Sequence, residues 1–183
     1  NFLINGSEGI AVGMTTSTPP HNLGEIINAE KLLMEFPNAT TADLLDIIEG
    51  PDFPTGGIVT NKDELLSIYE TGRGKIRIRG KAEIVRGKRK SDRDKIVITE
   101  IPYTMVGANI GKFLSDVAAL AESRKLPDIV DISNQSSKEG IRIEIELKKG
   151  ADAERILAGL YKKTKLEDTF GVNMLAIVDG RPE

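Results

Sequence analysis

The fold of this chain is decided by residues 95–147, which read KIVITEIPYTMVGANIGKFLSDVAALAESRKLPDIVDISNQSSKEGIRIEIEL. The apolar run at 95–101 predicts a strand, and strands are also expected at 128–133 and at the alternating segment 141–147. Between them, apolar residues recur at helical spacing, namely Ile110, Phe113, Leu114, Val117 and Leu120. A helix at 152–164 and an apolar strand at 170–178 complete a β-α-β-β-α-β order. The sequence therefore predicts an α+β fold that contains a ferredoxin-like unit.

The segment KIRIRGKAEIV, residues 75–85, comes just before this unit and alternates strictly. Its pattern predicts one half-buried strand, with Ile76, Ile78, Ala82 and Ile84 inside and Lys75, Arg77, Arg79 and Lys81 outside. Charges on one side of such a strand recur about every 6.6 Å, a row that could follow a nucleic-acid backbone. The alternative is an ordinary solubilising face. Residues 86–94, RGKRKSDRD, lack apolar residues and predict a hairpin tip.

Helices are predicted at 23–35, at 41–49 and after Asn61, with Asn22 and Thr40 or Thr41 as caps. Asn61 and Glu64 have the spacing of a capping box, and Gly72 would end the third helix. We therefore divide the chain into an N-terminal loop (1–22), a helical part (23–74) and a β-rich part (75–183).

The opening residues, NFLINGSEGIAVGMTTSTPPHN, predict an apolar wedge on a stiff mount. Gly6, Gly9 and Gly13 permit backbone geometries that side chains forbid, and they flank the short apolar run 10–12. Pro19 and Pro20 stiffen the approach to the first helix. The alternative is that Ile10 and Val12 are core residues of a strand.

Charge is distributed unevenly along the chain. The formal net charge is −3, yet residues 71–95 hold eleven Lys or Arg against three acids, which leaves −11 for the remainder. Such a basic segment on an acidic body is typical of nucleic-acid binding, although ordinary surfaces also carry basic strips. There is no cysteine and no apolar run long enough to span a bilayer, so we expect no disulfide, a cytoplasmic location and no membrane partner.

The residues that could carry catalysis do not form a site in the sequence. The single histidine, His21, follows two prolines, where a structural or hydrogen-bonding role is expected. The carboxylates are scattered without metal-ligand spacing, and the glycine-rich segments match no phosphate loop. We therefore expect no metal site, no nucleotide and no cofactor in this chain.

Seven segments of the chain resemble, in the same order, segments of the A-type subunit of bacterial type IIA topoisomerases, the family of DNA gyrase and topoisomerase IV. They are NGSEGIAVGM, PPHNLGE, GPDFPTGG, YETGRGK, ITEIPY, IRIEIELK and FGVNML. The resemblance implies most of the tower domain, just after the DNA-cleaving winged helix. Because Asn1 is not a methionine and the similarity begins at once, we expect an excised fragment.

The resemblance also implies roles. The isoleucine at the position of Ile10 would insert between base pairs and bend double-stranded DNA, while Arg73, Lys75, Arg77, Arg79 and Lys81 would hold phosphates. The nucleophilic tyrosine would lie upstream of the fragment, because Tyr69, Tyr103 and Tyr161 lack the preceding arginine that the family's nucleophile has. The complete enzyme is expected to be an A2B2 assembly, an isomerase that uses ATP and Mg²⁺ on its B-type subunit. The isolated fragment should be inactive.

Several alternatives stay open at this point. A stand-alone nucleic-acid-binding module would need aromatic residues on its sheet for stacking, and few aromatics are present. A purely structural or dimerising domain would bind no DNA. Segments 133–139 and 104–112 depart from the family pattern and put tower contacts there in doubt. The sequence does not choose between gyrase and topoisomerase IV, because the distinguishing wrapping domain is missing.

Overall fold

The computed structural model describes residues 1–87, 89, 92–107 and 109–182, which fall into two compact units. One unit comprises Asn1–Pro54, Val59–Arg77 and Thr169–Glu183, and the other comprises Thr55–Ile58 and Ile78–Asp168. Two of the lysines expected in the hairpin tip, Lys88 and Lys90, and Ala108 lie outside the described residues. The functional division proposed above at residues 22 and 74 is not tested by these units and stays a prediction.

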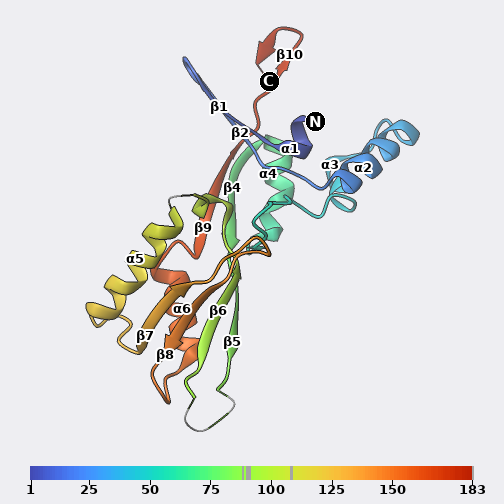
Figure 1. Cartoon of the computed structure of the whole chain (residues 1–183). Helices are drawn as coiled ribbons and strands as arrows, with labels where there is room; N and C mark the ends of the chain where they lie inside the picture. Colours follow the sequence, from blue (N-terminus) through green and yellow to red (C-terminus); the bar gives the residue numbers. More distant parts are fainter. Residues whose placement is uncertain (88, 90–91, 108, 183) are drawn as a thin grey trace. The chain divides into compact units, whose positions relative to one another are not determined.

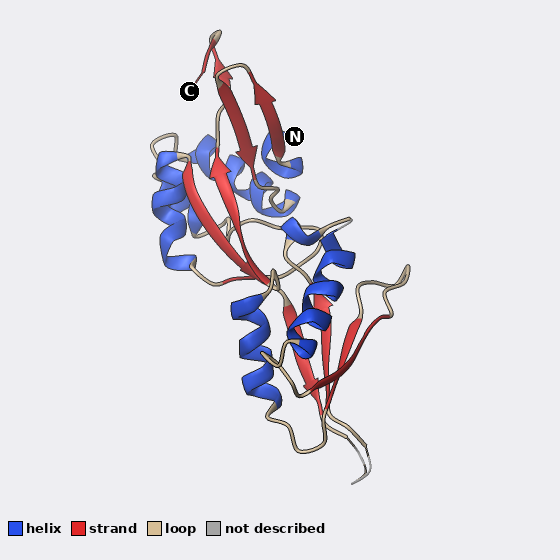
Figure 2. Cartoon of the chain, turned by 90° about the vertical axis from the view of Figure 1, so that its left-hand side faces the viewer, coloured by secondary structure: helices blue, strands red, loops and turns tan. Residues whose placement is uncertain are grey.

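The second unit is built on a four-stranded antiparallel sheet with the order β5-β6-β8-β7. Its strands are β5 (Lys81–Val85), β6 (Lys95–Glu100), β7 (Ile129–Asn134) and β8 (Ile143–Leu147). Helices α5 (Asn109–Glu122) and α6 (Ala153–Lys163) pack on the sheet (Figures 1 and 2). Alternate residues of β6 and β8 face these helices and are fully buried, namely Ile96, Ile98, Ile143, Ile145 and Leu147. The predicted α+β class is confirmed.

The order β-α-β-β-α-β is also observed, but its last strand joins a different sheet. Strand β9 (Glu167–Asn173) follows α6 and lies between β2 and β4 in the other sheet. In a ferredoxin-like unit, β9 would instead pair with the outer edge of β6, but β5 occupies that edge. Strands β5 and β6 are separated by only nine residues in the sequence, so pairing them costs less chain entropy than pairing β6 with the distant β9. Once β5 holds that edge, β9 must pair elsewhere.

The five-stranded sheet has the order β1-β2-β9-β4-β3. Its remaining strands are β1 (Ser7–Ala11), β2 (Met14–Thr18), β3 (Ile58–Val59) and β4 (Arg73–Arg79). The prediction of one continuous strand over 75–85 was therefore wrong, because the strand breaks at Gly80 and its halves enter different sheets. The Gly80 N–H donates to the Leu166 carbonyl at 2.7 Å, and a Cβ there would lie 2.7 Å from the Glu100 carbonyl oxygen.

The helices of the first unit follow their local signals closely. Helix α2 (Leu23–Glu35) has the predicted bounds, and the Asn22 side chain accepts from the Gly24 amide at 2.9 Å. Helix α3 (Thr41–Leu45) has a capping box with Thr40 but ends four residues earlier than predicted. The other helices are α1 (Phe2–Asn5) and α4 (Leu65–Thr71), and α4 ends at Gly72 in the left-handed conformation.

Asn61 does not cap a helix, contrary to the prediction. The 3-10 turn η1 (Lys62–Glu64) begins there without a side-chain cap. Instead the buried Asn61 amide donates to the Lys75 carbonyl at 2.9 Å and accepts from the Arg77 amide at 2.8 Å, so it ties this turn to β4.

The C-terminal residues also differ from the prediction of one strand over 170–178. A second hairpin, made of β10 (Ile177–Val178) and β11 (Arg181–Pro182), follows β9. Elsewhere in the chain, a short 3-10 turn, η2 (Tyr103–Met105), precedes α5. Among the described residues, no helix has the length and apolar character needed to cross a membrane.

Candidate nucleic-acid interface

The predicted apolar wedge is a two-stranded β-hairpin made of β1 and β2 (Figure 1). Ile10 pairs with Thr15 and Ala11 with Met14, which leaves Val12 and Gly13 as the two-residue turn. Gly13 has a φ of 77° and Gly6, at the base of β1, a φ of 69°, so both positions need the freedom that glycine has. Gly9 has ordinary strand geometry.

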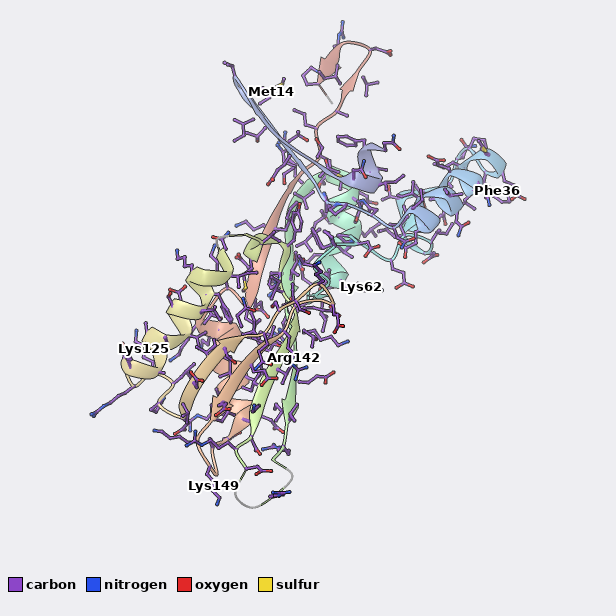
Figure 3. All side chains as sticks on the ribbon, in the orientation of Figure 1. Met14, Phe36, Lys62, Lys125, Arg142 and Lys149 are labelled. Carbon is purple, nitrogen blue, oxygen red and sulfur yellow. The ribbon has the colours of Figure 1, made fainter. Side chains whose placement is uncertain are left out.

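The side chains at the tip of this hairpin are open to solvent. Ile10 is 92 % exposed and Val12 is 103 % exposed, and Met14, just after the turn, is exposed as well (Figure 3). The alternative that Ile10 and Val12 are strand core is therefore excluded. Burying an isoleucine contributes about 1.5–3 kcal/mol, so these side chains are available to stabilise a contact with another molecule.

The hairpin has two different faces. Glu8, Ile10, Thr15 and Ser17 share one face, because residues paired across the strands point to the same side. Thr16 belongs to the other face and its hydroxyl donates to the Leu175 carbonyl at 3.2 Å. A mainly apolar hollow of about 240 Å³ lies there, lined in part by Met14, Leu175 and Ile177. Ile10 and Thr15 also line this hollow, and the Thr15 hydroxyl accepts from the Asn173 side-chain amide at 3.3 Å, so the Ile10 face is in part covered as well.

His21 fastens the base of the hairpin. Its ring is 3 % exposed, with Nδ1 3.0 Å from the Leu3 carbonyl and Nε2 2.5 Å from the Tyr69 hydroxyl. Because a carbonyl can only accept, Nδ1 carries the proton and Nε2 accepts from Tyr69. Burial lowers the pKa of His21 and raises the pKa of Tyr69, which favours the neutral form of both. The expected hydrogen-bonding role of His21 is confirmed.

Four of the five cations of the predicted phosphate-binding strip lie at alternate positions of β4, namely Arg73, Lys75, Arg77 and Arg79, whereas Lys81 begins β5. Arg73, Lys75 and Arg77 belong to the first compact unit, and Arg79 and Lys81 to the second. Within the part of the chain that the structure describes, Arg73 and Lys75 are exposed and have no ion-pair partner.

The other three cations are engaged by acids of their own unit. Arg77 lies 3.3 Å from Glu64, and Lys81 lies 3.8 Å from Glu100. Arg79 donates to Glu167 at 2.6 Å, and its guanidinium sits 4.6 Å from the centre of the Tyr161 ring. A phosphate would have to compete with these partners, so Arg73 and Lys75 are the better candidates.

The tyrosines do not have the environment of an activated nucleophile. The Tyr161 hydroxyl donates to the Gly80 carbonyl at 2.9 Å, and burial raises the pKa of Tyr161 as it does that of Tyr69. Tyr103 is 36 % exposed in η2. Across residues 1–87, 89, 92–107 and 109–182, no group of three or more His, Cys, Asp or Glu could hold a metal ion.

The four-stranded sheet offers no aromatic platform for RNA bases. None of the residues of β5, β6, β7 and β8 is aromatic. Next to its helix-free face, Glu144 is buried between Lys95, at 3.0 Å, and Arg142, at 2.7 Å, and the hydrogen bond from Lys95 lowers the pKa of Glu144. These contacts disfavour a module that reads RNA by stacking.

Sequence reasoning missed two features of this region. The ion pair between Arg79 and Glu167 joins residues that are 88 positions apart in the sequence, and no local pattern indicates it. Glu8 and Ile10 are two positions apart, so they share a face of any strand that contains both. The sequence would have shown this if the opening loop had been predicted as a hairpin.

The family described as the A subunit of DNA gyrase/topoisomerase IV matches residues 1–183. The chain belongs to this family. Its similarity to DNA gyrase A subunits is 49 % identity for Clostridium acetobutylicum, 44 % for Streptococcus pneumoniae and 42 % for Pseudomonas aeruginosa. Each comparison covers 100 % of this chain but only 21 %, 22 % and 19 % of the respective relative. The chain thus spans about a fifth of the length of these gyrase proteins, and the resemblance predicted from its motifs is confirmed.

Proposed function

We propose that this chain is the DNA-binding and DNA-bending tower region of the A-type protein of a type IIA topoisomerase. The observation that supports the proposal is the 92 % exposure of Ile10 on a narrow hairpin that the Thr16 hydroxyl joins to the Leu175 carbonyl, just after β9. Inserting an apolar side chain between base pairs costs a few kcal/mol of stacking per step. Burial of Ile10 would offset much of that cost, at about 1.5–3 kcal/mol.

Electrostatic attraction would come from cations outside the hairpin. Arg73 and Lys75 are exposed, and their spacing on β4 suits two phosphates of one strand. Such contacts are independent of base sequence and would hold the duplex against the protein while Ile10 kinks it. Arg77, Arg79 and Lys81 would take part only after exchanging their acidic partners for phosphates.

The chemistry of strand cleavage is assigned to other parts of the enzyme. We infer that a tyrosine outside these 183 residues attacks the DNA phosphodiester and stays joined to the cut end. The raised pKa values of Tyr69 and Tyr161 support this assignment, because a buried phenol is a poor nucleophile. The complete cytoplasmic enzyme would be an A2B2 assembly in which the B-type subunit supplies the ATP and Mg²⁺ sites, and the fragment alone would not relax DNA.

The proposal is tested by replacing Ile10 in the full-length A-type protein, in complex with its B-type partner. Ile10→Ala should reduce bending of a duplex, measured by energy transfer between dyes at its ends, and should lower DNA cleavage and relaxation by a similar factor. Met34→Ala is the matched control, because Met34 is also an exposed apolar residue, at 84 %, but lies on α2. If Ile10→Ala bends and relaxes DNA as the unchanged enzyme does, the wedge function is wrong.

A further inference from the structure

The β1–β2 hairpin carries a single charged side chain, and that side chain is acidic. Residues 7–18 read SEGIAVGMTTST, in which Glu8 is the only ionisable residue. Glu8 precedes Ile10 by two positions on β1, so the two side chains share a face. Ser17 pairs with Glu8 and Thr15 pairs with Ile10 on that same face. The face that would enter DNA therefore combines one wedge, one carboxylate and two hydroxyls, of which the Thr15 hydroxyl already accepts from the Asn173 amide at 3.3 Å.

The Glu8 carboxylate is open to a ligand. The residue is exposed, and among the residues that the structure describes it has neither an ion-pair partner nor a side-chain hydrogen bond. A shallow hollow of about 540 Å³ lies at the hairpin and is lined by residues of both faces, namely Glu8, Gly9, Ile10, Thr15, Thr16 and Ser17. Since the hairpin has no lysine or arginine, an unpaired carboxylate there opposes approach to the phosphates. A hydrogen-bond donor on the DNA that reaches the Glu8 carboxylate would offset this electrostatic repulsion.

The minor groove contains one kind of base donor. Proteins that insert apolar wedges between base steps commonly do so from the minor groove. A·T pairs display only acceptors there, whereas a G·C pair adds the guanine N2 amino group. An ionised carboxylate accepts hydrogen bonds and cannot donate them. Glu8 would therefore gain a partner beside a G·C pair and meet only acceptors beside an A·T pair.

With β1 lying along the duplex axis, the spacing of residues on the strand would set the position of that pair. Residues two apart on an antiparallel strand are about 6.8 Å apart along the strand, which is about two base steps of a duplex. Resting on the proposed wedge function of Ile10, we propose that Glu8 accepts a hydrogen bond from a guanine N2 amino group about two base pairs from the insertion step. Glu8 thereby makes the bending site selective for G·C at that pair.

The test uses the full-length A-type protein in complex with its B-type partner, on duplexes that differ only in this amino group. Replacing guanine by inosine removes the N2 amino group, and replacing adenine by 2,6-diaminopurine adds it. With the unchanged enzyme, cleavage and bending should favour the amino-bearing pair by about fivefold, the lower end for one base contact. Glu8→Ala should remove the preference and cleave both duplexes equally.

The controls separate the possible failures. Glu30→Ala removes an exposed acid on α2 and should leave the preference intact, while an unchanged melting temperature shows that Glu8→Ala still folds. If Glu8 only repels phosphates, Glu8→Ala strengthens binding of all duplexes equally and the inosine duplex behaves like the guanine duplex, which overturns the readout. If Ile10→Ala leaves bending intact, the wedge function fails first. If bending depends on Ile10 but not on the guanine amino group, the Glu8 proposal is wrong and the wedge function of Ile10 still holds.

Discussion

At the residue scale, His21 shows how a single buried polar side chain can anchor an exposed hairpin. Its two ring nitrogens join the Leu3 carbonyl in α1 to the Tyr69 hydroxyl on α4, while its own backbone follows β2. The hairpin that carries Ile10 is thus anchored on both sides of its base. An imidazole is suited to this task because, when neutral, it donates from one nitrogen and accepts at the other.

Stability of the chain should depend on pH through His21. Burial lowers the pKa of His21 below 6.5 in the folded state, so the unfolded chain binds more protons between the two values. The contribution of His21 is complete above 6.5 and is lost as the pH falls through the lowered value. His21→Gln should flatten this slope and cost about 1–3 kcal/mol, because the Leu3 or Tyr69 oxygen loses its partner.

Urea unfolding between about pH 8 and about pH 5 measures the free energy of unfolding and its slope. Tyr69→Phe is the matched control, because it removes one hydrogen bond but keeps the titrating histidine, and it should retain the slope. An unchanged slope in His21→Gln would contradict the assignment of a buried, neutral imidazole.

Some residues could be understood from the sequence and others could not. The glycines on both sides of the run at 10–12 predicted an unusual, exposed tip, and Ile10 is indeed 92 % exposed. Arg79 was predicted to be free for phosphate, yet it is clamped by Glu167 and Tyr161. The difference is physical, because turn geometry is a local property of the chain whereas an ion pair depends on which distant strands become neighbours.

At the element scale, helices follow local sequence signals, whereas the pairing of strands depends on residues far apart in the chain. Helix α2 has its predicted bounds because its Asn22 cap and its apolar spacing are local signals. The strand pattern at 75–85 predicted the burial of Ile76 and Ile78 correctly, but not the break at Gly80. Apolar and polar residues keep alternating across such a break when both strand segments bury the same set of alternate residues. The pattern alone therefore cannot show where one strand ends and the next begins.

Gly80→Ala should therefore destabilise the chain through steric overlap at this break. A Cβ at residue 80 would lie 2.7 Å from the Glu100 carbonyl oxygen and 2.7 Å from Leu166 Cδ1, and the backbone atom cannot easily move. The expected loss is about 1–3 kcal/mol, the usual cost of overpacking. Gly171→Ala in β9 is the control, because a Cβ there meets nothing within 4 Å. Thermal unfolding of both variants compares them, and equal melting temperatures would argue against a steric role for Gly80.

At the scale of the whole molecule, the net charge does not show how the cations proposed to bind phosphates are distributed. The chain carries −3 overall, while the segment 71–95 contributes eleven cations against three acids. The structure keeps four of the predicted phosphate ligands on β4 and places Lys81 on β5 in the other sheet. It also pairs Arg77, Arg79 and Lys81 with acids. Counting cations therefore overstates the number available to DNA, because pairing is set by tertiary neighbours that composition does not reveal.

This view makes a quantitative prediction about salt. Each phosphate contact on duplex DNA contributes about 0.9 to the slope of log affinity against log salt concentration. In the full-length A-type protein, the double variant Arg73→Gln/Lys75→Gln should flatten that slope by roughly 1.8, because both cations lack partners among the described residues. The double variant Arg77→Gln/Lys81→Gln should change it by less than half as much, since Glu64 and Glu100 already hold these side chains. Filter-binding titrations of one long duplex at several salt concentrations measure both slopes. Equal changes would mean that DNA displaces the acidic partners freely, and no change in either variant would make the strip an ordinary solvated surface.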